Sequence, residues 1–209
     1  MPRIVTRLVT QSRNKRRVNV HLDDAYAFSL ADTLAATLFV GQALDEATIA
    51  QLIAQDTYQR GMDKALRLIA RRPRSQHEID EALRRADFPP PVRERILARL
   101  HEMDYLDDKH FARWWVENRT TFNPRSLGAL RQELRQKGVA GPIIDEVLAD
   151  LDDAELALAA GRKRAYRWQH LAQDAFEKKM VGYLQRRGFS FPLARQVAQT
   201  LWEGWKAED

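Results

Sequence analysis

The chain repeats one segment three times, and the first copy, residues 79–100, reads IDEALRRADFPPPVRERILARL. The copies align without a gap on Leu83, Leu134 and Leu184, which lie 51 and 50 residues apart. Five further positions are apolar in every copy, at offsets of −4, +5, +9, +13 and +17 from that leucine. Self-similarity at a period of this size indicates a repeat architecture, in which each unit buries its apolar face partly against the next.

These offsets predict two helices separated by a tight turn in each copy. Offsets −4 and 0 place two apolar side chains on one helical stripe, and +9, +13 and +17 place three on a second stripe. The turn falls at +4, which is Gly138 and Gly188 in the later copies, and glycine accepts the left-handed conformation that ends a helix. The first copy has Asp87 there, which tolerates this conformation better than a branched residue does.

A further helical run precedes each pair, so we predict a unit of three helices. A capping box at Ser75 to Glu78 predicts a helix start in the first copy, and Asn123-Pro124 predicts a similar start in the second. We therefore expect a mainly α fold, an elongated array of three tandem three-helix repeats. The predicted repeats are residues 57–108, 109–151 and 152–209, and their leading helices lie near residues 58–72, 109–119 and 154–167.

Residues 1–56 predict a small N-terminal α+β head. Its β-branched and alternating apolar residues are typical of short antiparallel strands, with a turn at Asp23-Asp24. A short helix through Leu34 and Leu38 would close at Gly41, and Asp45 would cap a second helix. The three predicted strands lie within residues 4–10, 18–22 and 26–30.

The composition bounds the class of protein and the kind of partner. The chain has 209 residues, no cysteine, and 34 basic against 29 acidic residues, a net charge of +5. No apolar run approaches the roughly 20 residues that span a membrane, so we expect a soluble, cytoplasmic protein without membrane contact, and a monomer. The basic excess is spread thinly, so an anionic partner would have to meet local clusters.

Motifs for catalysis are missing from the sequence. No glycine-rich phosphate loop followed by Lys-Ser or Lys-Thr occurs, and no two histidines have a metal-ligand spacing. The carboxylate pairs Asp107-Asp108 and Asp152-Asp153 stand at predicted helix starts, where they cap and complement the helix dipole. We predict no enzyme activity, no metal and no cofactor.

Basic residues recur at the same helix end in every copy and could align as a stripe that faces an anion. A purely structural explanation is that cations in the last turn of a helix offset its negative end. The tryptophans could stack on bases, but we interpret most of them as core residues. The candidate binding residues, the basic stripe, are Arg71, Arg72, Arg74, Arg84, Arg85, Arg135, Lys137, Lys163, Arg186 and Arg187.

Several motifs together resemble the RecX family of RecA regulators. The first copy contributes Arg72-Pro73-Arg74-Ser75 with Glu78, and then Tyr105-Leu106-Asp107-Asp108 followed by Phe111-Ala112. The later copies contribute residues 131–139 and 184–190, so the resemblance covers most of the chain from about Tyr58 onward. The segment 17–24 with Phe28 is similar to an extension that some members carry. The chain departs from the family pattern at Asp24, Asp87 and Asp104, where glycine is usual.

The resemblance implies a bacterial, non-enzymatic regulator that binds RecA filaments on single-stranded DNA, touching the DNA directly or through RecA. Such a protein modulates, and by expectation inhibits, RecA ATPase, strand exchange and co-protease activity in DNA repair and the SOS response. A repeat array can contact successive filament subunits at once, and the basic stripe would face the filament or its DNA. Two alternatives stay open: an independent DNA-binding helical module, and an interaction scaffold for another partner.

Overall fold

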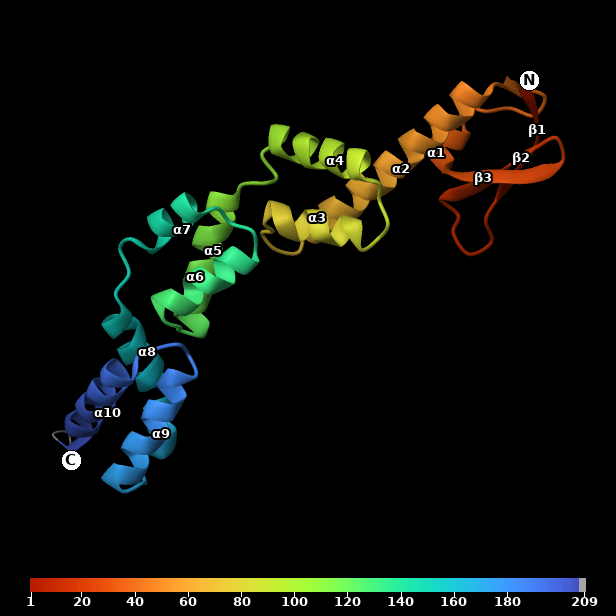
Figure 1. The fold of residues 1–209 in the computed structure, drawn as a ribbon. Helices are drawn as coiled ribbons and strands as arrows, with labels where there is room; N and C mark the ends of the chain where they lie inside the picture. Colours follow the sequence, from red (N-terminus) through yellow and green to blue (C-terminus); the bar gives the residue numbers. More distant parts are fainter. Residues whose placement is uncertain (207–209) are drawn as a thin grey trace. The chain divides into compact units, whose positions relative to one another are not determined.

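The computed structural model describes the backbone of residues 1–206 and the side chains of residues 1–204. The chain divides into two compact units, each described by itself: unit 1 is residues 1–71 and 80–102, and unit 2 is residues 72–79 and those from 103 onward. Figure 1 labels the elements in chain order. Within the described residues, no helix combines the length and apolar character needed to cross a membrane.

Unit 1 begins with an antiparallel sheet of four strands in the order β3-β2-β1-β4. The register pairs Leu8 with Val20, and Val20 in turn with Phe28. The three predicted strands are confirmed, whereas the fourth was not predicted because two residues are too short to show an alternation. The strands are β1 (Arg3–Thr10), β2 (Arg17–Leu22), β3 (Ala25–Ala31) and β4 (Ala43–Leu44).

The apolar face of this sheet packs on helix α2 (Glu46–Ile69), which contributes Ile49 and Leu52 to the core of the head. The predicted cap is confirmed, because the Asp45 carboxylate accepts a hydrogen bond of 2.8 Å from the backbone N–H of Thr48. The prediction of two separate helices near Asp45 and Tyr58 is wrong. No proline interrupts the segment, and α2 runs unbroken for 24 residues from the sheet to the first repeat. Helix α1 (Asp32–Ala35), in contrast, is shorter than predicted and ends before Leu38.

The predicted helix pairs and their turns are confirmed in all three copies. The carbonyl of the aligned leucine accepts a hydrogen bond from the N–H five residues later, at 3.2 Å for Leu83, 3.1 Å for Leu134 and 3.2 Å for Leu184. The residue at +4 has φ of 58° at Asp87, 76° at Gly138 and 92° at Gly188, so each first helix ends in a Schellman motif. The pairs are α3 (Gln76–Arg84) with α4 (Pro90–Glu102), α6 (Leu127–Gln136) with α7 (Gly141–Leu148), and α9 (Gln173–Gln185) with α10 (Phe191–Lys206).

The leading helices of the second and third copies are α5 (Asp108–Phe122) and α8 (Asp153–Ala165). Both begin at the predicted carboxylate pairs, with Asp107 and Asp152 as N-caps. The predicted start at Asn123-Pro124 is wrong: Ser126 caps α6 by accepting from the N–H of Ala129 at 3.1 Å. Asn123 instead ends α5, and its side chain accepts a hydrogen bond from Arg187, as does the carbonyl oxygen of Pro124.

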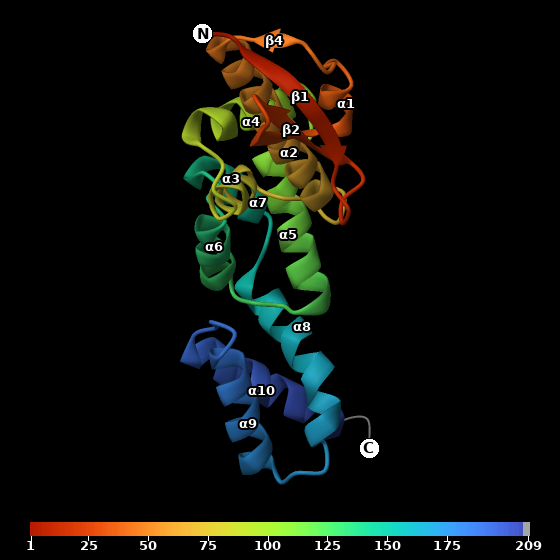
Figure 2. The ribbon, with the colours of Figure 1, turned by 90° about the vertical axis from the view of Figure 1, so that its right-hand side faces the viewer.

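In unit 2, α5, α6 and α7 pack on one another, and so do α8, α9 and α10 (Figures 1 and 2). One apolar cluster runs through both groups, with Phe111 and Phe176 among its fully buried members. Four tryptophans pack at the edge of this cluster, which agrees with their interpretation as core residues; the side chain of Trp205 lies outside the described part of the chain. They are Trp114, Trp115, Trp168 and Trp202.

Candidate functional site

The residues of the basic stripe fall into two groups according to where their side chains go. Six are exposed, and one of these, Lys163, contacts the preceding repeat. Of the remaining five, which we call the exposed group, four stand at offsets +1 and +2 from the aligned leucine, at the C-terminal ends of α3, α6 and α9. The second group consists of Lys163 and the four half-buried residues Arg72, Arg74, Lys137 and Arg187. The exposed group is Arg71, Arg84, Arg85, Arg135 and Arg186.

Glu78, the last residue of the capping box, forms ion pairs with three residues of the second group. Its Oε1 lies 2.9 Å from Nη2 of Arg72, 2.7 Å from Nζ of Lys137 and 4.0 Å from Nη1 of Arg74. Burial favours the neutral acid, but hydrogen bonds from Arg72 and Lys137 outweigh it and lower the pKa of Glu78 to about 2. The carboxylate is therefore ionised at neutral pH and offsets the charge of these cations.

Lys163 and Arg187 complete the second group, and both reach back to the preceding repeat. The Arg187 guanidinium donates to the carbonyl oxygen of Pro124 at 3.0 Å and to the side chain of Asn123, and it lies 4.5 Å from the centre of the Tyr183 ring. Lys163 donates to the carbonyl oxygen of Thr121. Half of the predicted stripe thus serves contacts within unit 2.

We call the set of contacts between the N-terminus of the first helix of one pair and the next copy a joint, and the first joint lies at the N-terminus of α3. Ser75 caps α3 by accepting from the N–H of Glu78 at 3.1 Å, and its hydroxyl donates to the carbonyl oxygen of Lys137 at 2.6 Å. The first residue of α5, Asp108, accepts from the N–H of Gln76 at 2.8 Å. The first turn of α3 is therefore held by the leading helix and by the turn of the next copy.

The same joint recurs at the N-terminus of α6. The N–H of Ser126 donates to the carbonyl oxygen of Arg187 at 3.1 Å. The first residue of α8, Asp153, accepts from the N–H of Leu127 at 2.6 Å. A Cβ at Gly188 would lie 2.6 Å from Oγ of Ser126, so the turn and the cap are in close contact. Within unit 2, the two joints hold the first turns of α3 and α6 against the following helices and turns.

The exposed group has few partners. Arg84 and Arg85 bind Glu81 at 2.8 and 2.7 Å, and hydrogen bonds from Arg84 and then Arg85 lower the pKa of Glu81 to about 2. Their side chains remain 61% and 74% exposed, so both reach solvent. Across residues 1–204, Arg135 and Arg186 show no ion pair. These are the cations that an anionic partner can meet.

One cluster of cations, around Glu133, was not predicted from the sequence. Nε of Arg119 and Nε1 of Trp115 both donate to Oε2 of Glu133 at 2.8 Å, and the Arg119 guanidinium lies 4.5 Å from the Trp115 ring. Arg125 lies 3.2 Å from the other carboxylate oxygen. The spacing of four between Trp115 and Arg119 on one helix face is the signal that could have found this pair.

Family models match four segments of the chain. Residues 3–45 match the N-terminal domain of the regulatory protein RecX, and residues 62–100, 107–148 and 151–198 match the first, second and third three-helix domains of RecX. The Regulatory protein RecX of Bacillus subtilis (strain 168) is 32% identical over 192 residues, which cover 90% of this chain and 73% of the relative. That of Bacillus pumilus (strain SAFR-032) is 30% identical over 209 residues, which cover 98% and 80%.

Two crystal structures have a similar fold. One, of a regulatory protein RecX, has a TM-score of 0.61 at 27% identity, covering 94% of this chain and 99% of its own. The other, of RecX from Lactobacillus salivarius, has a TM-score of 0.57 at 22% identity, covering 70% and 97%, and supports the fold alone.

Proposed function

Because the chain belongs to the RecX family of regulatory proteins, we propose that it is a non-enzymatic regulator that binds RecA filaments on single-stranded DNA. It inhibits RecA ATPase, strand exchange and co-protease activity, and so acts in DNA repair and the SOS response. We place this activity in the cytoplasm and assign it to a monomer. The contact units are the three repeats, residues 57–108, 109–151 and 152–209.

The observation that carries the proposal is the recurrence of exposed cations at equivalent helix ends. Arg84, Arg135 and Arg186 stand within two positions of one another in the repeat register. A filament presents the same surface at every subunit, so several weak contacts on one chain add up to avidity. The cations at offset +3, Lys137 and Arg187, have a separate role, because they hold the joints.

The test is the single-stranded-DNA-dependent ATPase rate of RecA, measured at constant salt as this protein is added. We expect the rate to fall at amounts well below one molecule per RecA subunit. The charge-reversed variant Arg135→Glu with Arg186→Glu should need at least about tenfold more protein for the same inhibition, because charge complementarity governs such an encounter. The joints are untouched in this variant, so its fold is retained.

A matched control distinguishes the effect of where the charges are reversed from the effect of the changed net charge of the protein. Lys178 and Lys179 lie exposed on α9, and Lys178→Glu with Lys179→Glu removes the same charge from other turns of that helix. This control should inhibit like the wild type. An unchanged ATPase rate with wild-type protein, together with salt-dependent binding to bare DNA, would favour the independent DNA-binding module. Absence of both activities would favour a scaffold for another partner.

A further inference from the structure

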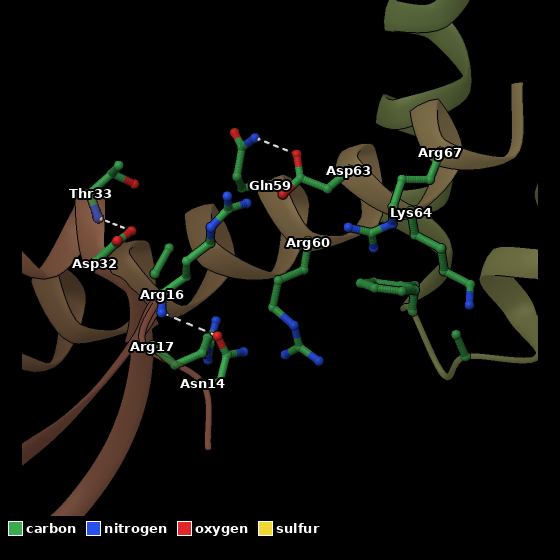
Figure 3. A pocket seen from close by; sticks show the side chains of 13 residues that line it. Asn14, Arg16, Arg17, Asp32, Thr33, Gln59, Arg60, Asp63, Lys64 and Arg67 are labelled. Carbon is green, nitrogen blue, oxygen red and sulfur yellow. Dashed lines mark hydrogen bonds between the residues drawn. The ribbon is translucent and has the colours of Figure 1, made fainter. Parts of the chain in front are cut away.

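Unit 1 contains a basic cavity between its sheet and the middle of α2 (Figure 3). The cavity has a volume of about 700 Å³. Arg16 lines it from the sheet side, and Arg60, Lys64 and Arg67 line it from α2. Figure 3 shows these three side chains spread along α2, with Arg16 approaching from the strands.

The cavity borders the turn of the first copy, which has no repeat in front of it. In the second and third copies, the turn after the first helix is covered by Ser75 and Ser126 of the preceding repeat. In the first copy the corresponding turn borders the cavity through Ala86 and Phe88. Ala86 stands at offset +3, where the later copies have Lys137 and Arg187, so no cation reaches across.

The cations of this cavity are uncompensated. Within residues 1–204, the side chains of Arg16, Arg60, Lys64 and Arg67 make no ion pair and no hydrogen bond to protein. The neighbouring Arg17 differs, because both oxygens of Asp56 accept from it at 2.7 and 2.8 Å. Four free cations therefore face two lining carboxylates, so the recess has an excess of positive charge and attracts anions.

Those two carboxylates are already occupied by local donors. Asp63 accepts from the side-chain amide of Gln59 at 2.9 Å, and Asp32 accepts from the backbone N–H of Thr33 at 2.8 Å. Arg60, Lys64 and Arg67 recur at spacings of four and three, so they share one face of α2. The cavity thus offers a row of cations along a rigid helix.

A second hollow of about 510 Å³ adjoins the first, and both are lined by Asn14, Arg17 and Arg60. It is bordered by Tyr26, whose side chain is 60% exposed. The Tyr26 hydroxyl lies 3.1 Å from Oγ of Ser29, which holds the ring on the surface of the sheet. An exposed aromatic side chain of this kind is a platform on which a nucleic-acid base can stack.

We propose that the two hollows form a binding site for single-stranded nucleic acid on the N-terminal head. Arg16, Arg60, Lys64 and Arg67 bind the phosphates of the strand, and Tyr26 stacks on a base. In a duplex the faces of the bases are covered by neighbouring base pairs, so they cannot stack on a protein ring. A site that combines a row of cations with an exposed ring therefore favours a single strand. The site acts without RecA and shares no cation with the basic stripe at the ends of α3, α6 and α9.

The test is the affinity of the full chain for a fluorescent oligo(dT) strand, measured by anisotropy over a series of salt concentrations without RecA. Arg60→Glu with Lys64→Glu should weaken binding at least about tenfold. The slope of log K against log salt should fall by about 1.4, because each phosphate contact on a single strand contributes about 0.7. The milder pair Arg60→Gln with Lys64→Gln should give the same slope change, and thermal unfolding checks that both variants fold.

Three comparisons make the outcome decisive. Lys178→Glu with Lys179→Glu, which removes the same charge, should bind oligo(dT) like the wild type. Tyr26→Ala should weaken binding to oligo(dT) about fivefold or more and leave binding to an abasic strand of the same length unchanged. Tyr26→Phe keeps the ring and should bind oligo(dT) like the wild type. The proposal would be overturned if the lysine control lost as much affinity for oligo(dT) as the α2 variants, or if the α2 variants kept their affinity. It would also be overturned if the α2 variants lost as much affinity for polyglutamate as for oligo(dT). RecA inhibition that persists in the α2 variants would leave the proposed function standing.

Discussion

Glu78 makes the stability of the first joint depend on pH. Its pKa is lowered from 4.5 to about 2 in the folded chain, so its stabilising effect is complete above pH 4.5 and is lost as the pH falls through 2. We expect acidification from pH 6 to pH 2 to lower the free energy of unfolding more in the wild type than in Glu78→Gln, by on the order of 2 kcal/mol after solvent screening. Denaturant unfolding at each pH measures both proteins, and parallel pH curves would contradict this role.

Gly138 is constrained by its backbone and by its neighbour. Its φ is 76°, and a Cβ there would lie 2.4 Å from Cβ of His77. We expect Gly138→Ala to lower the free energy of unfolding by more than about 1 kcal/mol, because a left-handed alanine and a backbone shift at the joint both cost free energy. Urea unfolding measures the change.

The neighbouring Gly141 provides the control for this substitution. A Cβ at Gly141 would meet no atom within 4 Å, so Gly141→Ala should keep or raise the stability. If both alanine variants were equally stable, the close contact at the turn of α6 would be unimportant.

Among the elements, α2 holds the head through one buried ion pair. Asp56 is 3% exposed, and it accepts from Arg17 at 2.7 and 2.8 Å and from the N–H of Ala31 at 2.7 Å. Asp56→Ala would leave the Arg17 charge and a strand N–H without their acceptor. We expect a loss of about 3 kcal/mol in the stability of unit 1, since removing one partner of a buried pair is strongly destabilising.

Chemical denaturation followed by signals from the sheet checks this expectation. Asp63, two turns further along α2, is exposed, and within residues 1–204 its carboxylate accepts a side-chain hydrogen bond only from Gln59. Asp63→Ala should therefore change stability by less than about 0.5 kcal/mol. Similar effects of the two substitutions would show that the ion pair does not anchor the sheet.

Over the whole chain, the repeats were predictable because their turns and apolar positions are local. Asp87 adopts the left-handed φ that its position in the repeat predicted. Asp23, Asp24 and Asp104 also have positive φ. The continuity of α2 was not predictable from period alone, because it depends on packing against the sheet at one end and α4 at the other.

The site was harder to predict, because neighbouring positions on one helix end face different surroundings. Arg135 is exposed, whereas Lys137 binds Glu78, which lies 59 residues away in sequence. Whether a cation binds the preceding repeat depends on which residue of that repeat lies opposite, and a local sequence pattern does not include that residue. The spacing of Arg60, Lys64 and Arg67 was visible, but the cavity needs the fold of the head.

The joints also predict how loss of the third repeat spreads through the molecule. Truncation after Leu151 removes Asp153 and Arg187, the acceptors for the N–H groups of Leu127 and Ser126. In a repeat array each unit depends on its direct neighbours, so we expect these two amides to lose protection from hydrogen exchange. The corresponding amide of Gln76 keeps its acceptor, Asp108, and should retain more of its protection. Equal loss at both helix starts would mean that unit 2 unfolds as one body, whereas unchanged exchange at α6 would show that the joint adds no stability.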